Sequence, residues 1–320
     1  FLISSEYGTM QAQISGKLKF KTESNIDYPV VGDWVCVEYY NNYTLAIIHN
    51  ILTRKTILKR KTSGKKIDYQ FIGANIDTAC IIQSLDVDFN VARLERYMVA
   101  VLDANITPVI LLSKCDLIGD EERNQTILTV KNRYPNHKII IFSNKSYENM
   151  DKIKKVFVPR QTYCIIGSSG VGKTTLLNNL IGSDKFTTKE IRKHEHGGKH
   201  TTTRRQMITL NNGALFIDTP GMRELGIISA DSGIKKVFSD IETITKQCRF
   251  PNCSHTHETG CAIHKAIQSG QLTQKHFNNY AKLLKEQAYH TRSYVEKRIK
   301  DKKFGKMIKS VMNKKNKKQL

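Results

Sequence analysis

The clearest chemistry in the sequence belongs to a glycine-rich turn, GSSGVGKTT, over residues 167–175. The apolar run TYCII precedes it and a stretch with helical character follows it, so strand, turn and helix are expected in that order. Glycines let backbone N–H groups close around phosphate oxygens, and a lysine and a helix N-terminus add positive charge. We therefore predict a phosphate-binding loop made of Gly167, Ser168, Ser169, Gly170, Val171, Gly172, Lys173, Thr174 and Thr175.

Two later segments predict the Mg²⁺ ion that accompanies a nucleoside triphosphate. The Thr174 hydroxyl would complete the Mg²⁺ shell. The strand-like run LFID ends in Asp218, which would hold Mg²⁺ through water, while the N–H of Gly221 would contact the γ-phosphate. Between the two lies HGGKHTTTRR, whose threonines could close on the ion as a switch. Thr202 is the predicted contact, with either neighbouring threonine as the alternative.

The residue that orients the attacking water is not the usual one. In Ras-like GTPases a glutamine follows the Asp-x-x-Gly motif, and here Met222 stands in its place. A thioether cannot orient water. His200, just before the threonines, is the candidate catalytic residue because an imidazole titrates near neutrality and can accept a hydrogen bond from water. The alternative is that His200 is only a loop residue.

The loops expected to read the base precede the phosphate loop. An aspartate at the end of a parallel strand can accept both the N1–H and N2–H of guanine, and a site built on such bonds rejects bases that lack them. Two apolar strands end in suitable loops, one resembling Asn-Lys-x-Asp and the other Ser-Ala-Lys. The predicted guanine-binding residues are Ser113, Lys114, Cys115 and Asp116, followed by Ser143 and Asn144. This order is that of a GTPase cyclically permuted, and permutation is tolerated where the original termini lie close together.

Three cysteines and a histidine fall within a short segment near the C-terminus. Cys248, Cys253, His255 and Cys261 offer three thiolates and one imidazole, a tetrahedral set suited to one structural Zn²⁺ ion. His257 and His264 are nearby alternatives for the imidazole ligand. All four positions would be filled by protein, which argues against a catalytic role for the ion.

Three domains are expected around these motifs. Residues 1–65 are rich in short strand-like runs and predict a small closed β-barrel of the OB type that binds RNA, with a sandwich or SH3-like barrel as alternatives. Residues 66–228 alternate strands with helices and predict a doubly covered, mostly parallel sheet, the GTPase domain. Residues 229–320 predict a mostly helical zinc-binding domain with a basic C-terminal extension.

The individual elements follow from apolar runs and turn residues. Strand-like runs lie at 11–20, 33–40 and 44–52 in the first domain, and at 77–85, 107–113, 138–143, 162–167 and 214–219 in the second. Helix-compatible stretches lie at 90–104, 120–134, 146–156 and 173–182. A long basic helix is expected over 276–312, with a disordered tail after it.

Composition indicates the surroundings in which the protein works. The net charge is +22 for 320 residues, which suggests a polyanionic partner. No apolar run is long enough to cross a membrane, and the N-terminus shows no secretory pattern. The cysteines outside the predicted zinc site are scattered, mostly in apolar runs, as in reduced cytosolic proteins. We therefore predict a cytoplasmic protein that binds nucleic acid and no membrane. A monomer is expected.

Taken together, these motifs resemble those of the RsgA/YjeQ family of bacterial GTPases that depend on the small ribosomal subunit. The resemblance covers nearly the whole chain and is carried by PVVGD, SKCDL, GSSGVGKTTLLN, GGKHTTTRR, DTPGMRELG and CRFPNCSHTHETGCAI. It implies late maturation of the 30S subunit, binding to 16S rRNA, and subunit-stimulated hydrolysis of GTP to GDP and phosphate. His200 matches the histidine proposed for catalysis in the family, whereas Ser113 departs from the commoner Asn or Thr.

Two other functions are compatible with parts of the sequence. One is an RNA-binding assembly scaffold in which nucleotide only stabilises the fold, and Met222 in place of glutamine leaves it open. The other is an ATPase or kinase-like enzyme, against which Asp116 argues. Stimulation of GTP turnover by the subunit separates the first from the main prediction, and the base preference of an Asp116→Asn variant tests the second.

Overall fold

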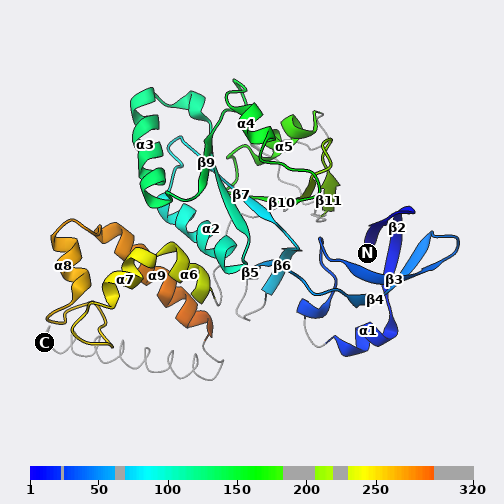
Figure 1. Ribbon diagram of the computed structural model, residues 1–320, viewed down its shortest axis with the longest axis horizontal. Helices are drawn as coiled ribbons and strands as arrows, with labels where there is room; N and C mark the ends of the chain where they lie inside the picture. The colour runs from blue at the N-terminus through cyan, green and yellow to red at the C-terminus, as the bar shows by residue number, and fades with distance from the viewer. Residues whose placement is uncertain (23–24, 62–68, 183–205, 219–229, 292–320) are drawn as a thin grey trace, which may run out of the picture.

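The computed structural model describes residues 1–22, 25–61, 69–182, 206–218 and 230–291. Its centre is a six-stranded sheet with the order β11-β12-β10-β7-β8-β9 (Figure 1). The strands span Thr78–Ser84 (β7), Thr107–Ser113 (β8), Lys138–Ile141 (β9), Thr162–Ile166 (β10), Gln206–Thr209 (β11) and Leu215–Asp218 (β12). Neighbouring strands run parallel except at the edge, where β11 pairs antiparallel with β12. The predicted mostly parallel sheet is thus present.

Helices cover both faces of this sheet, which is why its strands are apolar on both sides. They are α2 (Val91–Asp103), α3 (Asp120–Arg133), α4 (Met150–Lys154) and α5 (Lys173–Ile181). Successive residues alternate between the two cores: Ile81 and Ile110 pack with α2 and α3 residues, whereas Ile82 and Leu111 pack with α4 and α5 residues. The strongly amphipathic helix α2 contributes Leu94, Tyr97, Met98, Val99 and Val101 to the first core.

The N-terminal residues form a separate mixed sheet of order β1-β2-β4-β3. Its strands span Leu2–Ser5 (β1), Gly8–Ile14 (β2), Val35–Tyr40 (β3) and Leu45–Ile51 (β4), and short helices cover Gly16–Lys21 (α1) and Asn25–Asp27 (η1). Among the described residues β1 and β3 do not pair, so the predicted closed barrel is not confirmed. The strand expected over 11–20 stops at Ile14, because the Ser15 hydroxyl accepts a hydrogen bond from the N–H of Leu18 and caps α1.

A hairpin connects the N-terminal sheet to the central sheet. Strands Ile57–Lys61 (β5) and Tyr69–Ala74 (β6) pair with each other. Leu58 and Ile72 are buried in the core that lies against α2. The hairpin therefore belongs to the central domain by packing, although it lies across the predicted boundary at residue 65.

The C-terminal part is helical, with α6 (Asp231–Val237), α7 (Ser239–Thr245), α8 (Ala262–Gln268) and α9 (Gln274–Thr291). Helix α6 packs tightly on α2. A Cβ added to Gly233 of α6 would lie 2.2 Å from the carbonyl oxygen of Val99, so only glycine allows this approach. The predicted long basic helix is described as far as Thr291, and its remainder lies outside the described residues.

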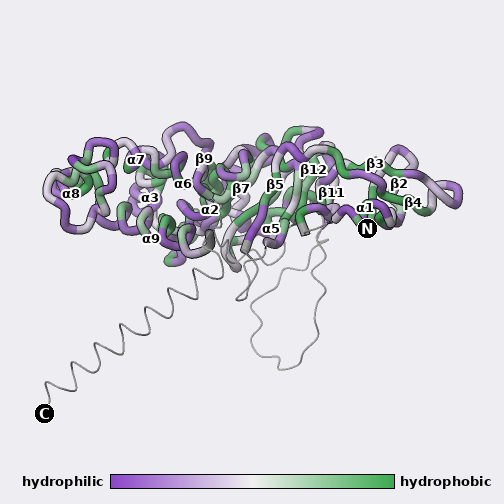
Figure 2. The backbone as a smooth tube through the Cα atoms, turned by 90° about the horizontal axis from the view of Figure 1, so that it is seen from below, coloured by the Kyte–Doolittle hydropathy of each residue, from purple (hydrophilic) through white to green (hydrophobic). Residues whose placement is uncertain are grey.

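The N-terminal sheet and the C-terminal helices lie at opposite ends of the molecule, with the central sheet between them (Figures 1 and 2). Figure 2, which views the molecule from below, shows the same arrangement along its length. Within the described residues, no helix combines the length and apolar character required to span a membrane.

Candidate functional site

The predicted phosphate loop follows the buried central strand β10 and leads directly into α5. Gly170 and Gly172 have φ values of 83° and 90°, a backbone conformation that suits glycine. A Cβ at Gly172 would also lie 2.7 Å from the amide nitrogen of Asn144. Lys173 donates to the carbonyl oxygens of Gly167, at 2.8 Å, and Ser168, so its ammonium group lies over the loop. Thr174 and Thr175 lie in the first turn of α5, which Lys173 begins.

The first predicted base loop lies beside the phosphate loop rather than apart from it. Ser113, fully buried at the end of β8, donates from its hydroxyl to the carbonyl oxygen of Val171 at 2.8 Å. Ser113, one of the predicted guanine-binding residues, thus links the first base loop to the phosphate loop. Asp116 lies in the short helix Cys115–Leu117 (η2) and is exposed to solvent.

The second predicted base loop makes the equivalent link from the next strand. Asn144 donates from its side-chain amide to the carbonyl oxygen of Gly172 at 3.0 Å and accepts from the amide of Asn179 at 3.2 Å. Ser143 is buried and its hydroxyl accepts from the N–H groups of Lys145 and Ser146, which shapes the loop. Both loops therefore bond to consecutive carbonyls of the phosphate loop, and the three segments form one site.

Two aspartates that no motif predicted also contact this site. Asp86 lies 2.8 Å from the ammonium group of Lys114, and Asp88 accepts from the Ser168 hydroxyl at 3.2 Å. Burial opposes ionisation of Asp86, but hydrogen bonds from Lys114, Ser84 and the N–H of Asp88 outweigh it and lower its pKa. The carboxylate is thus kept charged beside Lys114, one of the predicted guanine-binding residues. The segment carries no established motif that could have revealed this role.

Among the remaining predicted nucleotide-binding residues, only Asp218 lies within the described part of the chain. The backbone of Asp218 ends β12, the strand that runs parallel beside β10. This places the aspartate predicted to bind Mg²⁺ next to the phosphate loop, because both follow the carboxyl ends of neighbouring parallel strands. The predicted residues His200, Thr202 and Gly221 lie outside the described residues.

The four predicted metal ligands come together in the C-terminal part. The ligand atoms of Cys248, Cys253, His255 and Cys261 all lie within 4.8 Å of one another. The Nδ1 atom of His255 faces the sulfur atoms of Cys248 and Cys261, at 3.6 and 3.5 Å. Burial lowers the pKa of His255, which favours the neutral ring that binds metal. This set fits a structural zinc site, in which three thiolates and one imidazole complete a tetrahedron.

The alternative histidines do not share this position. His264 directs its Nε2 atom to the carbonyl oxygen of His255 at 3.1 Å, and His257 is exposed. The N–H of Ala262 donates to the sulfur of Cys248 at 3.4 Å, as expected where a backbone dipole supports a thiolate. The cluster therefore contains its four ligands and one backbone hydrogen bond that supports the Cys248 sulfur.

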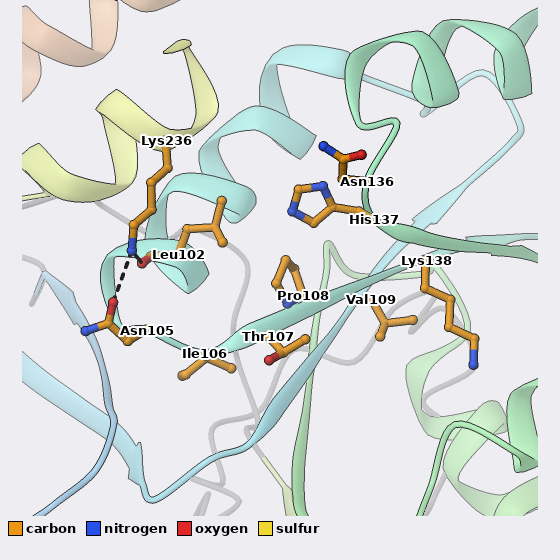
Figure 3. Close-up of a pocket in the computed structure, with 10 residues that line it drawn as sticks. All are labelled: Leu102, Asn105, Ile106, Thr107, Pro108, Val109, Asn136, His137, Lys138 and Lys236. Atoms are coloured by element: carbon orange, nitrogen blue, oxygen red, sulfur yellow. Dashed lines mark hydrogen bonds between the residues drawn. The ribbon is translucent and has the colours of Figure 1, made fainter.

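A separate cleft of about 580 Å³ lies at the other end of the strands, where β8 and β9 begin (Figure 3). Lys236 of α6 donates there to the carbonyl oxygen of Leu102 at 3.0 Å and to Asn105 at 3.1 Å. These bonds cap the C-terminal end of α2, where a positive charge is favourable. The cleft contains none of the predicted site residues and forms a junction between α2 and α6.

The geometry defines the class of protein. A phosphate loop follows the central strand β10. The two base loops, which follow β8 and β9, bond to the phosphate loop and come earlier in the chain. This is a P-loop GTPase with its segments in circularly permuted order.

Comparison with known proteins identifies the family. The family model for RsgA GTPase matches residues 51–228. Small ribosomal subunit biogenesis GTPase RsgA 2 of Vibrio parahaemolyticus is 38% identical over 312 residues, 98% of this chain and 85% of that protein. RsgA 1 of Listeria innocua is 43% identical over 265 residues, 82% of this chain and 74% of that protein. The chain belongs to the RsgA GTPase family, and it is a GTP hydrolase.

Solved structures share the fold. The crystal structure of YjeQ from Thermotoga maritima matches with a TM-score of 0.64 and 21% identity, covering 90% of this chain and 93% of that one. YloQ, described as a circularly permuted GTPase, matches with a TM-score of 0.61 and 25% identity, covering 92% of each chain. The permuted order inferred from the sequence is thus confirmed.

Proposed function

We propose that this GTPase acts in late biogenesis of the small (30S) ribosomal subunit in the cytoplasm. It binds the subunit and its 16S rRNA as a monomer, hydrolyses GTP to GDP and phosphate when the subunit stimulates it, and then leaves. The observation that carries the nucleotide part is the pair of bonds from Ser113 and Asn144 to the phosphate loop, which unite three segments in one site. The names of the relatives support the ribosomal part.

We assign roles to the site residues from the sequence motifs in which they lie. Asp116 reads guanine N1–H and N2–H, and Lys114, held by Asp86, packs over the base. Lys173 neutralises the β- and γ-phosphates. Thr174, Thr202 and Asp218 would hold Mg²⁺, which would stabilise charge on the transferred phosphoryl group. Gly221 contacts the γ-phosphate, and His200 orients the attacking water.

The two ends of the chain provide contacts to RNA, supplementing the GTPase domain. The proposed domains are 1–65, 66–228 and 229–320. The separate small core of the N-terminal sheet supports an independent unit there, whereas Leu58 already belongs to the GTPase core. Zn²⁺ held by Cys248, Cys253, His255 and Cys261 organises the C-terminal unit. The net charge of +22 favours phosphate contacts that are weakened by salt.

The deciding experiment measures GTP turnover with and without purified small subunits across a salt series. Stimulation that declines as salt rises is expected, because phosphate contacts release counterions. A flat response to both subunits and salt would contradict the ribosomal function. His200→Ala should remove the stimulation while leaving GTP binding intact; stimulation retained in that variant would assign the water to another residue.

The base preference has its own test. Asp116→Asn should weaken GDP binding and shift preference toward xanthosine diphosphate, because the amide can donate to the extra carbonyl. Asp120→Asn, an equivalent change in the exposed first turn of α3, is the matched control and should bind GDP normally. Equal binding of adenosine and guanosine diphosphates by the unaltered protein would refute guanine specificity.

A further inference from the structure

Glu148, in the loop between β9 and α4, contacts both predicted base loops at once. Its carboxylate accepts from the Cys115 thiol at 3.3 Å and pairs with Arg123 of α3. Its backbone carbonyl accepts from the N–H of Ser143 at 3.2 Å. Cys115 is the immediate neighbour of Asp116, and Ser143 begins the second base loop. One residue thus joins segments that come from different strands.

We propose that Glu148 is a positioning residue for guanine recognition, and that Arg123 serves as its counter-ion. It holds the loop that carries Asp116 against the loop that starts at Ser143. This inference rests on the proposed guanine-reading role of Asp116 and deepens it. Glu148 acts through Cys115 and the backbone rather than by touching the nucleotide.

The chemistry of the three side chains suits this role. Burial, followed by the hydrogen bond to Glu148, raises the pKa of Cys115 to about 11, so the thiol keeps its proton and can donate it. Hydrogen bonds from Arg123 and then Cys115 lower the pKa of Glu148, so the carboxylate stays ionised. Cys115 is only 2% exposed, so the donor of this bond is shielded from water, whereas the Glu148 side chain is 39% exposed at the surface of the loop.

The backbone around Glu148 needs such support. Tyr147 and Asn149, on either side of it, both have φ values of 59°, in the left-handed region. Lys114, on the other loop, has the same φ. Residues other than glycine occupy this region at an energetic cost and persist there only where surrounding contacts hold them. The bonds to Cys115 and Arg123 are contacts of this kind, and they come from outside the loop.

Neutralising the carboxylate tests the proposal. Glu148→Gln keeps the shape of the side chain and removes the charge that pairs with Arg123. Calorimetric titration with GDP and with inosine diphosphate, which lacks the 2-amino group, reports on the Asp116 contact. We expect GDP to bind about tenfold more weakly and the preference for GDP over inosine diphosphate to fall about fivefold, as a misplaced acceptor loses most of its discrimination.

Matched variants separate positioning from stability. Glu122→Gln makes the same charge change on the exposed surface of α3, one residue from Arg123, and should leave both affinities within about twofold. Cys115→Ser keeps a donor and should retain the preference for GDP, whereas Cys115→Ala should lose it as Glu148→Gln does. Thermal unfolding of each variant shows whether it is folded at the titration temperature.

The outcomes are distinguishable. A preference for GDP that is unchanged in both Glu148→Gln and Cys115→Ala overturns the proposal. If Asp116→Asn abolishes the preference while those two variants keep it, the guanine site stands and only the role of Glu148 fails. If Asp116→Asn also keeps the preference, the guanine-reading role itself is wrong. If Glu148→Gln fails to fold, the pair Cys115→Ser and Cys115→Ala decides.

Discussion

The two ends of the molecule are joined to the GTPase domain in different ways. The N-terminal sheet has a small core of its own, built on Met10, Ala12, Ala46 and Ile48. The C-terminal helices have no core apart from that of the GTPase domain within the described residues. Ile234, Phe238, Ile263 and Leu283 are buried in the same cluster as Leu94 and Met98 of α2.

Polar contacts reinforce the C-terminal attachment. Glu95 of α2 is 2% exposed and accepts from Arg133 at 2.7 Å and from Asn279 of α9. Arg96 forms two bonds of 2.7 Å with Glu286 of α9. Since shared cores unfold together, we infer that the C-terminal helices and the GTPase domain form one cooperative unit. The N-terminal sheet is expected to open by itself.

Loss of the metal should have the largest effect. Structural zinc supplies much of the folding free energy of small metal-binding modules, so Cys253→Ser or chelation should lower the Tm of the GTPase domain by at least about 10 °C. Calorimetry together with metal analysis measures this. Cys36→Ser, at an exposed thiol in β3, is the control and should not change the main transition. A zinc-free protein whose GTPase domain melts at the original temperature would break the comparison.

Removing Glu95 should come next. Glu95→Ala removes the buried carboxylate that Arg133 and Asn279 share and leaves Arg133 with its 3.5 Å pair to Asp240, which should cost about 3 kcal/mol of unfolding free energy. Urea unfolding followed at both α9 and the central sheet measures it, and both probes should shift together. Glu121→Ala, exposed on α3, should cost less than about 0.5 kcal/mol. A shift at α9 alone would mean that the helices unfold independently.

The same residue gives a pH dependence. Burial raises the pKa of Glu95 above its ordinary value despite the opposing charge of Arg133. The part of the unfolding free energy that comes from protonation of Glu95 is therefore fully present below the ordinary carboxyl pKa and is lost as the pH rises through the raised pKa. Glu95→Gln should remove this part of the pH profile, as measured by unfolding free energy between about pH 4 and 7. An unchanged profile would assign the dependence elsewhere.

A matched pair of conservative substitutions compares the two units directly. Ile48→Val in the N-terminal core and Ile110→Val in the central sheet each remove one buried methylene, worth about 1 kcal/mol. By hydrogen exchange, the first should speed opening of β4 alone, whereas the second should speed β8 and α9 together. Faster exchange of α9 in the Ile48→Val variant would show that the N-terminal sheet is not separate.

The smallest effect is expected at the surface of the N-terminal sheet. Tyr7 stacks on Tyr43 with ring centroids 4.1 Å apart and meets Tyr39 edge-on at 5.4 Å. Because Tyr7 is half exposed, Tyr7→Ala should cost about 0.5–1 kcal/mol, confined to that sheet. Exchange of amides in β2 and β3 measures it. An equal loss in the central sheet would contradict the independence of the two units.

The central strands could be predicted because helices cover both faces of the sheet and force long apolar runs. Edge strand β11 (QMIT) was missed because an edge strand with exposed side chains needs no such run. Helix α1 was read as strand because its capping residue, Ser15, follows directly on β2. In the N-terminal part, local patterns indicate strands but do not specify whether the sheet closes into a barrel.

The site was predictable where a motif specifies its own chemistry, as in the phosphate loop and the cysteine cluster. The contacts that connect motifs were not. Ser113 reaches Val171 across 58 positions of the chain, and Glu148 reaches Cys115 across 33. Neither partner can be read from spacing, because the folded sheet alone brings the strand ends together. Asp86 was missed for the same reason.

Gly233 constrains how this protein can vary during evolution. Every other amino acid carries the Cβ atom that would collide with the carbonyl of Val99, so no replacement there is mild. An Ala substitution would have to be accompanied by a shift of α6 along α2, which the bonds of Lys236 to the end of α2 oppose. Lineages that lose this glycine are therefore expected to carry compensating changes in α2, and such paired changes would record the contact in their genomes.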